Sequence, residues 1–207
     1  AACGGGENRN FQQRDAVQAR KISSRIAETA RAAGQLIVRA LPWVLLGAAL
    51  VFYVTAQVRP FAPSYIEPDP DGYIWMAKKM AQLDVPLVEQ PDPFLFHSHV
   101  WVENSDGMVS AKFAPGYPLL LAIAYRAGGD LALFWVSPIA GGLALIGAFL
   151  LFREWMPLLP AVLGVVTLVA NEMYLSYSGY LLSHAANVCF VTWGMFFLWK
   201  WYRRPDP

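Results

Sequence analysis

The sequence predicts an all-α membrane protein that crosses the bilayer about four times and carries one long polar loop on the extracytoplasmic side. Its composition is the first reason, because 56% of the 207 residues are hydrophobic and only 15% are charged, which is too apolar for an ordinary soluble domain. The second is a set of apolar windows of about 20 residues, the length that a helix needs to cross a bilayer. The third is an uneven distribution of charge between the segments that join these windows.

Four windows are predicted to span the membrane: Ala40–Gln57, Leu131–Phe152, Pro157–Tyr174 and Leu181–Tyr202. The charged segment before the first window is longer than the corresponding part of a signal peptide, so we expect an uncleaved anchor. The chain starts without Met and stops soon after the fourth window, and we therefore expect it to be the N-terminal portion of a longer protein.

The charge pattern predicts the orientation of these spans. Basic residues precede the first window, follow the second and surround the end of the fourth, and such ends are cytoplasmic by the positive-inside rule. Residues 1–35 are then a basic cytoplasmic tail, and residues 36–207 form the membrane domain. The loop from Val58 to Asp130 has nine acidic residues against five basic ones, so it lies outside. We expect a multi-pass protein of the plasma or inner membrane with a cytoplasmic N-terminus.

Short amphipathic helices are predicted within this loop. Apolar residues recur at helical spacing from Gly72 to Leu83. Closely spaced prolines up to Pro70 disfavour helix in the residues before them, so we expect regular structure to begin near Asp71. The stretch GYPLLLAIAYRAGG is too short to span and predicts an interfacial or re-entrant helix. Between Pro86 and Lys112 the only strand-like run is FLFHSHVWV.

Asp71 is the first candidate for chemistry, because the unpaired amides at the start of a helix stabilise an ionised carboxylate. The alternative is that Asp71 is an N-cap and nothing more. Asp69, two residues earlier, either shares a site with Asp71 or belongs to a Pro-rich turn. Two close carboxylates can bind a divalent cation or divide the roles of acid and base.

Lys112 and the three histidines are the remaining candidates. Lys112 precedes the stiff FAPGYP turn and suits a lipid phosphate, although an ordinary snorkelling lysine fits equally well. His97 and His99 face the same side of an extended segment, but two histidines are fewer ligands than zinc needs. His184, at the outer start of the fourth window, is an ionisable residue near the membrane core; an interhelical hydrogen bond is its alternative explanation.

The order of these segments resembles the start of a GT-C membrane glycosyltransferase. A basic tail and a span are followed by an acidic loop with EPDPDGYIWMAKKM, by KFAPGYPLLLAIAYRAGG, and by paired spans with SGYLLSHAANVCFVTWGMFFLW. The closest group is family 39 and the protein mannosyltransferase-like enzymes, and the resemblance covers about Pro42 to Tyr202.

The resemblance implies a donor sugar on a polyprenyl phosphate, and a lipid, glycan or protein acceptor, with inversion at the sugar and no nucleic-acid partner. It implies that Asp71 acts as the base that deprotonates the acceptor hydroxyl, and that Lys112 stabilises the departing lipid phosphate. Many relatives have a second acid directly after the catalytic one, whereas this chain has Gly72. The partner carboxylate is then Asp69 or comes from elsewhere, and either aspartate remains a candidate for the base.

The alternative function is a non-catalytic membrane transporter or an envelope-assembly subunit. A transporter is expected to carry ionisable residues or helix breaks within its spans, whereas the windows here contain almost no ionisable residues. The glycines Gly141, Gly142, Gly147 and Gly164 are predicted instead to be points of close contact between helices.

Overall fold

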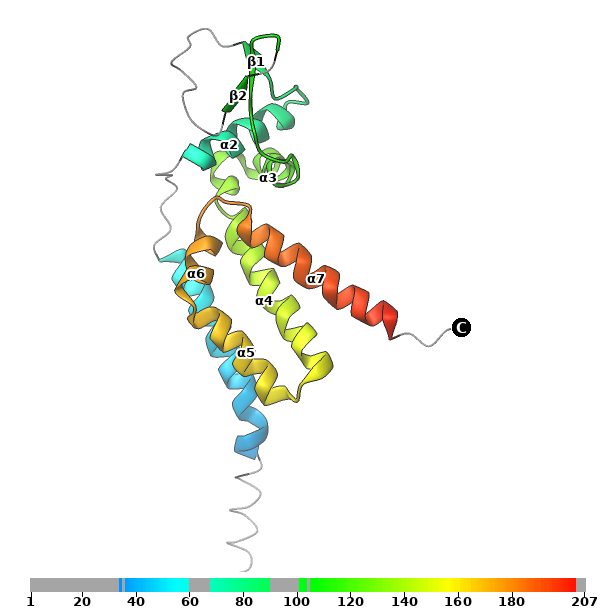
Figure 1. Cartoon of the computed structure of the whole chain (residues 1–207). Coiled ribbons are helices and arrows are strands. Elements are labelled where there is room, and N and C mark those ends of the chain that lie inside the picture. The colour runs from blue at the N-terminus through cyan, green and yellow to red at the C-terminus, as the bar shows by residue number, and fades with distance from the viewer. Residues whose placement is uncertain (1–33, 35, 60–67, 90–100, 104, 204–207) are drawn as a thin grey trace, which may run out of the picture. The chain divides into compact units, whose positions relative to one another are not determined.

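The computed structural model describes residues 34, 36–59, 68–89, 101–103 and 105–203 (Figure 1). The chain divides into two units, Ala1–Leu45 and Leu46–Pro207, and the packing described below concerns the second. The described part is mainly helical, as predicted. A small antiparallel sheet is the exception, with the strands in the order β1-β3-β2.

Two helices among the described residues are long and apolar enough to cross a membrane, Leu36–Val58 and α4 (Val136–Trp155). The predicted third span forms two helices, α5 (Leu158–Ala170) and α6 (Glu172–Gly179), which are bent by 65° and together qualify as a further candidate. The predicted fourth span forms α7 (His184–Tyr202), which is long enough but is not among these candidates. Its polar residues and its Trp and Tyr side chains account for its lower hydropathy.

The start of α4 differs from the prediction. Leu131 was expected to begin the second span, but residues up to Leu133 belong to α3 (Gly116–Leu133), and α4 begins only at Val136. α3 contains a break at Gly128 and Gly129, and Gly129 has a φ of 70° and a ψ of −158°. Only glycine adopts that conformation without strain, so this glycine pair fixes the place where α3 changes direction.

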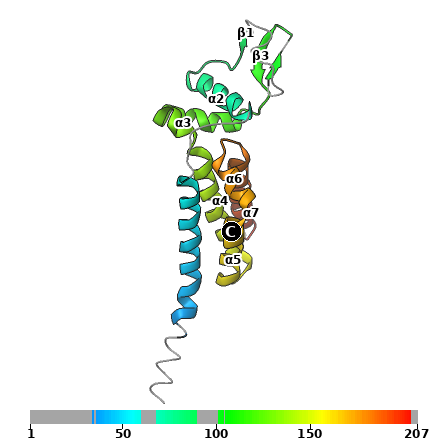
Figure 2. The same cartoon turned by 90° about the vertical axis from the view of Figure 1, so that its left-hand side faces the viewer.

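The helical bundle, comprising Leu46–Val58 and α4–α7, is arranged around α4. α7 runs parallel to α4, since Ser137 contacts Leu182, Leu143 contacts Trp193, and Glu154 contacts Lys200. The α5–α6 pair runs the opposite way, because Gly164 lies against Phe152 and the Tyr174 hydroxyl donates to the carbonyl of Gly141 at 2.7 Å. The segment Leu46–Val58 is also antiparallel to α4 (Figures 1 and 2). Three elements thus run alongside α4.

Small residues and buried hydroxyl groups join the helices of the bundle. A side chain at Gly141 would overlap Tyr53 and Ser178, one at Gly147 would press on Trp193, and one at Gly164 would lie 2.8 Å from the ring of Phe152. Tyr53 donates a hydrogen bond of 2.8 Å to the carbonyl of Pro138. The prediction that these glycines are points of helix contact is confirmed, including Gly142, which lies at ordinary contact distance from Tyr53.

The loop layer, comprising α2 (Pro68–Ala81), α3 and the three strands, lies beyond the end of the bundle at which α4 begins (Figure 2). Its strands are β1 (Val88–Glu89), β2 (Trp101–Glu103) and β3 (Met108–Ala111), with Val88 opposite Val109 and Val102 opposite Ser110. β2 contains the described end of the run that looked strand-like. α2 packs on α3, and one hydrophobic core joins them to the start of α7 through buried residues such as Ala77, Leu121, Leu182 and Ala186.

Candidate functional site

Asp71 lies in the first turn of α2 with its side chain exposed. The expectation that this helix begins near Asp71 is wrong, because α2 begins at Pro68. The physical reason is that proline at the first helical positions loses no hydrogen bond and already has a helical φ. Asp71 is therefore inside the helix and is not its N-cap, yet it stays within the turn where the helix dipole stabilises a carboxylate.

The absence of a side chain at Gly72 lets the segment that contains Lys112 lie close to the start of α2. A Cβ atom on Gly72 would lie 2.7 Å from Cε2 of Phe113 and 3.3 Å from Cβ of Ala111. The ring of Phe113 thus occupies the space of the missing side chain, and the segment Ala111–Phe113, which includes Lys112, passes beside the start of α2. This contact explains why the residue after Asp71 is glycine in this chain, where an acid would have to displace a packed ring.

Tyr73 links this contact to the start of α7. Its ring stacks on Phe113 with centroids 4.1 Å apart and meets Tyr117 edge to face at 5.0 Å. Its hydroxyl donates to Oγ of Ser183 at 3.3 Å, and Ser183 precedes His184. The chain segments that carry Asp71, Lys112 and His184 therefore converge on one aromatic side chain, Tyr73, which is 8% exposed.

A second hydroxyl chain fastens the loop layer to the bundle beneath this point. The hydroxyl groups of Tyr117 and Ser137 lie 2.7 Å apart, and Ser137 donates to the carbonyl of Leu182 at 3.1 Å. Ser137 is 1% exposed, so this hydrogen bond satisfies a polar group that would otherwise be costly to bury. Burial raises the pKa of the Tyr117 phenol above its ordinary value, which keeps this hydroxyl protonated as a donor.

His184 is exposed and stacks on the ring of Tyr177, with centroids 4.6 Å apart. It is the first residue of α7. The contact that His184 makes with α6 is thus a ring stack and not the interhelical hydrogen bond given as its alternative explanation, and the histidine remains open to solvent beside Ser183.

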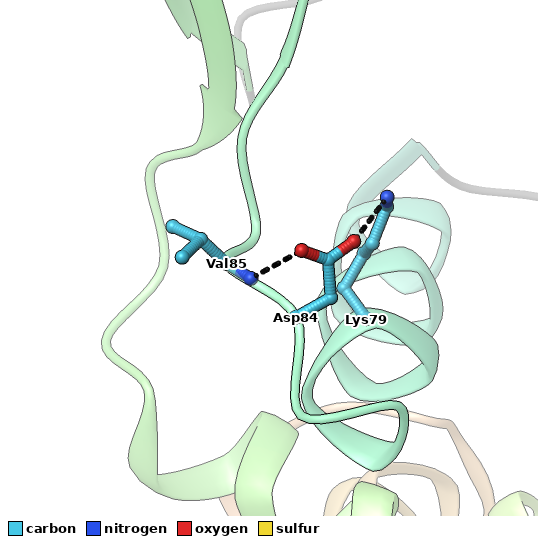
Figure 3. A network of polar contacts seen from close by, with 3 residues as sticks. All are labelled: Lys79, Asp84 and Val85. Atoms are coloured by element: carbon cyan, nitrogen blue, oxygen red, sulfur yellow. Dashed lines mark hydrogen bonds and ion pairs between the residues drawn. The ribbon is translucent and has the colours of Figure 1, made fainter.

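The two lysines of α2, Lys78 and Lys79, are each held in an ion pair. Lys79 Nζ lies 2.8 Å from the Asp84 carboxylate, which also accepts a hydrogen bond from the Val85 amide (Figure 3). The hydrogen bond with Lys79 lowers the pKa of Asp84. Lys78 pairs with Asp130 at 2.5 Å.

Asp71 and Lys112 differ from these paired residues. Both are exposed, and within the part of the chain that the structure describes neither has an ion-pair partner. Both side chains are therefore free to engage a bound molecule.

Three of the predicted accessory residues are not placed. His97 and His99 lie outside the described residues, and Asp69 belongs to the first turn of α2 without a described side chain. Among the described residues, no group of three or more His, Cys, Asp and Glu side chains could hold a metal ion.

Five residues that organise the site were not predicted from the sequence: Tyr73, Phe113, Ser183, Tyr117 and Ser137. Tyr73 stood in the apolar stripe of the predicted helix, but a stripe does not tell which of its members meets a hydroxyl group. The one signal available in the sequence was Gly72 itself, which stands where the resemblance leads us to expect an acid. A glycine at such a position is consistent with a closely packed neighbour.

Comparison with known proteins gives no match to this chain, whether with protein-family models, curated proteins or solved structures.

Proposed function

We propose that this chain carries the site of an inverting membrane glycosyltransferase that takes its sugar from a polyprenyl-phosphate donor. The observation that carries the proposal is the convergence at Tyr73, through Phe113 and Ser183, of the segments bearing Asp71, Lys112 and His184. A carboxylate and a cation free of ion pairs then stand on adjoining segments beside the bundle. One can accept a proton while the other balances a departing phosphate.

In this reaction Asp71 removes the proton from the acceptor hydroxyl as its oxygen attacks the anomeric carbon. The bond from that carbon to the phosphate oxygen breaks, and the electron pair leaves with the lipid phosphate. Lys112 stabilises the negative charge that develops there. Asp69 remains the second candidate for the base, since it shares the first turn of α2.

The arrangement of the bundle supports a multi-pass topology. α4 is long and apolar enough to cross a membrane, and the α5–α6 pair and α7 contact it from near its end at Phe152 and Glu154 to its beginning at Ser137. If α4 crosses, these neighbours cross with it, in alternating directions. By the charge rule, the end with Arg153 and Arg203 is then cytoplasmic, and the loop layer is extracytoplasmic.

The test is Asp71→Asn in the full-length protein, with sugar transfer from a polyprenyl-phosphate donor as the readout. We expect the rate to fall by roughly 10²–10⁴-fold, the usual contribution of a general base. Asp84→Asn is the matched control, because Asp84 is an exposed carboxylate of the same layer whose partners are Lys79 and Val85. Wild-type turnover by the Asp71 variant, with Asp69→Asn inactive, would move the role to Asp69. Full activity in both variants would refute the proposal.

A further inference from the structure

The ends of α4 and α7 farthest from the candidate site form an aromatic and basic patch. Trp155 at the end of α4 meets Trp199 edge to face, with ring centroids 5.1 Å apart. Trp199 in turn stacks on Tyr202 at 6.1 Å, and the guanidinium carbon of Arg203 lies 4.6 Å from the Trp199 ring. We call this set, with Arg153, Trp201 and the Glu154–Lys200 pair, the α4–α7 end.

Aromatic rings of this patch remain on the surface although their neighbours pack together. Trp155 is 51% exposed, Trp201 is 70% exposed and Tyr202 is 75% exposed. Indole and phenol rings combine an apolar body with a polar edge, and such rings prefer the boundary between hydrocarbon and water. Exposed rings gathered at one level of two parallel helices therefore fit a membrane interface.

The patch is also positively charged. It contains Arg153, Lys200 and Arg203 against Glu154, so its formal charge is +2, three cations less one carboxylate. Lys200 is neutralised by Glu154 at 2.6 Å, which leaves the two arginines. Arg153 uses one N–H to bond the carbonyl of Met156 at 2.8 Å. The remaining donors of a guanidinium group match the geometry of a phosphate.

The length of α4 is sufficient to place this patch at the level of the lipid headgroups. A helix of 20 residues is about 30 Å long at 1.5 Å per residue, which equals the thickness of the hydrocarbon core. If α4 begins at one face of the bilayer near Ser137, Trp155 reaches the headgroups of the other. The same depth applies to Trp199, because it packs on Trp155.

We propose that the α4–α7 end binds the headgroups of anionic phospholipids, with Arg153 and Arg203 on the phosphate oxygens and the exposed rings at the level of the lipid glycerol. This site is separate from the glycosyl-transfer site, which lies at the other end of α4, and it does not depend on that proposal. An anionic phospholipid matches both the positive charge and the exposed aromatic rings of the α4–α7 end.

Thermal unfolding of the detergent-purified protein with added phosphatidylglycerol or phosphatidylcholine tests the site. We expect phosphatidylglycerol to raise the Tm more than phosphatidylcholine does. The double variant Arg153→Gln/Arg203→Gln should lose this difference and bind phosphatidylglycerol roughly 30-fold more weakly, since each basic residue near an anionic surface contributes about fivefold. The control is Arg59→Gln/Arg126→Gln, two exposed arginines outside the patch, which should retain the difference.

Native mass spectrometry of the unaltered protein keeps the proposal testable if the double variant fails to fold. Selective retention of phosphatidylglycerol from an equimolar mixture with phosphatidylcholine would support the site. Equal retention of the two lipids would overturn it, and so would an equal loss of the Tm difference in both double variants. A full Tm shift produced by soluble glycerol phosphate alone would also overturn it, because the patch would then recognise a phosphate without a lipid.

Discussion

The loop layer and the helical bundle bury different kinds of groups. In the loop layer, aromatic rings of Tyr73, Phe113 and Tyr117 pack together, and the exposed Lys78–Asp130 ion pair links α2 to α3. In the bundle, glycines and backbone carbonyls form close contacts around a core of Ala49, Tyr53, Leu145, Val165 and Val169. Other large apolar side chains face outward, including Phe190 at 62% exposure and Phe197 at 60%. The first pattern suits water and the second suits lipid.

This difference shows which force holds each region together. Burying aromatic surface from water contributes about 1.5–3 kcal/mol for each large side chain, so the loop layer can rely on the hydrophobic effect. Lipid removes that driving force between helices, which then associate through close packing and hydrogen bonds. The bundle should therefore be more sensitive to small changes in shape, and the loop layer to changes in its aromatic and polar contacts.

The largest expected effect is that of Gly141→Ala in the bundle. The added methyl group would overlap Tyr53 and lie 2.6 Å from Oγ of Ser178. We expect the free energy of unfolding to fall by about 3 kcal/mol, at the upper end for overpacking, as measured by unfolding in detergent. Gly194→Ala is the control, since nothing lies within 4 Å of the position of its Cβ. Equal stability of the two variants would contradict the role of close packing in the bundle.

A smaller loss of stability with a larger loss of activity is expected for Gly72→Ala in the loop layer. The methyl group must displace Phe113, so we expect a cost of about 1–2 kcal/mol. We also expect a roughly 10²-fold lower kcat for the proposed transfer, because the segment with Lys112 would shift relative to the start of α2. The measurements are unfolding and sugar transfer. Gly116→Ala, in the first turn of α3 with open space around it, should keep both properties. Loss of activity in the control as well would show that any change in this layer is harmful, whatever its position.

The smallest effect concerns the junction between the two regions and depends on pH. The pKa of Tyr117 is raised by burial, so the stability that its neutral form provides is complete below the unfolded pKa of about 10. It is lost as pH rises above that value, since the unfolded chain then releases a proton that the folded chain keeps. Tyr117→Phe should lower stability by about 1 kcal/mol at neutral pH through the lost hydrogen bond. It should also make the free energy of unfolding decline less steeply between about pH 9 and 11, on either side of the unfolded pKa of roughly 10.

Urea unfolding across that range measures this effect, and Tyr180→Phe, at an exposed tyrosine, is the control. A decline of unchanged slope in the Tyr117 variant would show that the alkaline loss arises at other groups.

The helices were predictable from the sequence because hydropathy and helical spacing are local properties. The boundaries at Pro68 and Val136 were not, since proline is acceptable in a first turn and the apolar residues Leu131–Leu133 serve α3 as well as they would serve α4. The break at Asn171 also escaped prediction. Its side chain accepts a hydrogen bond from the Tyr174 amide at 3.1 Å and starts α6, a local capping signal within a run that reads as continuous.

Of the candidate site, Asp71 and Lys112 could be chosen from residue type and position. Their convergence could not, because it depends on the contact of Gly72 with Phe113 and on the bond from Tyr73 to Ser183, a residue 110 positions away. Long-range pairings of this kind leave no periodic trace in the sequence.

The bend between α5 and α6 has a consequence for the depth of the polar turn at Asn171. α5 has 13 residues and rises about 20 Å, and α6 with its eight residues would add about 12 Å if it continued straight. A bend of 65° reduces that second part to roughly 5 Å along the axis of α5, so the pair spans about 25 Å of a hydrocarbon core of about 30 Å. The polar turn at Asn171 would then lie below the level of the surrounding headgroups.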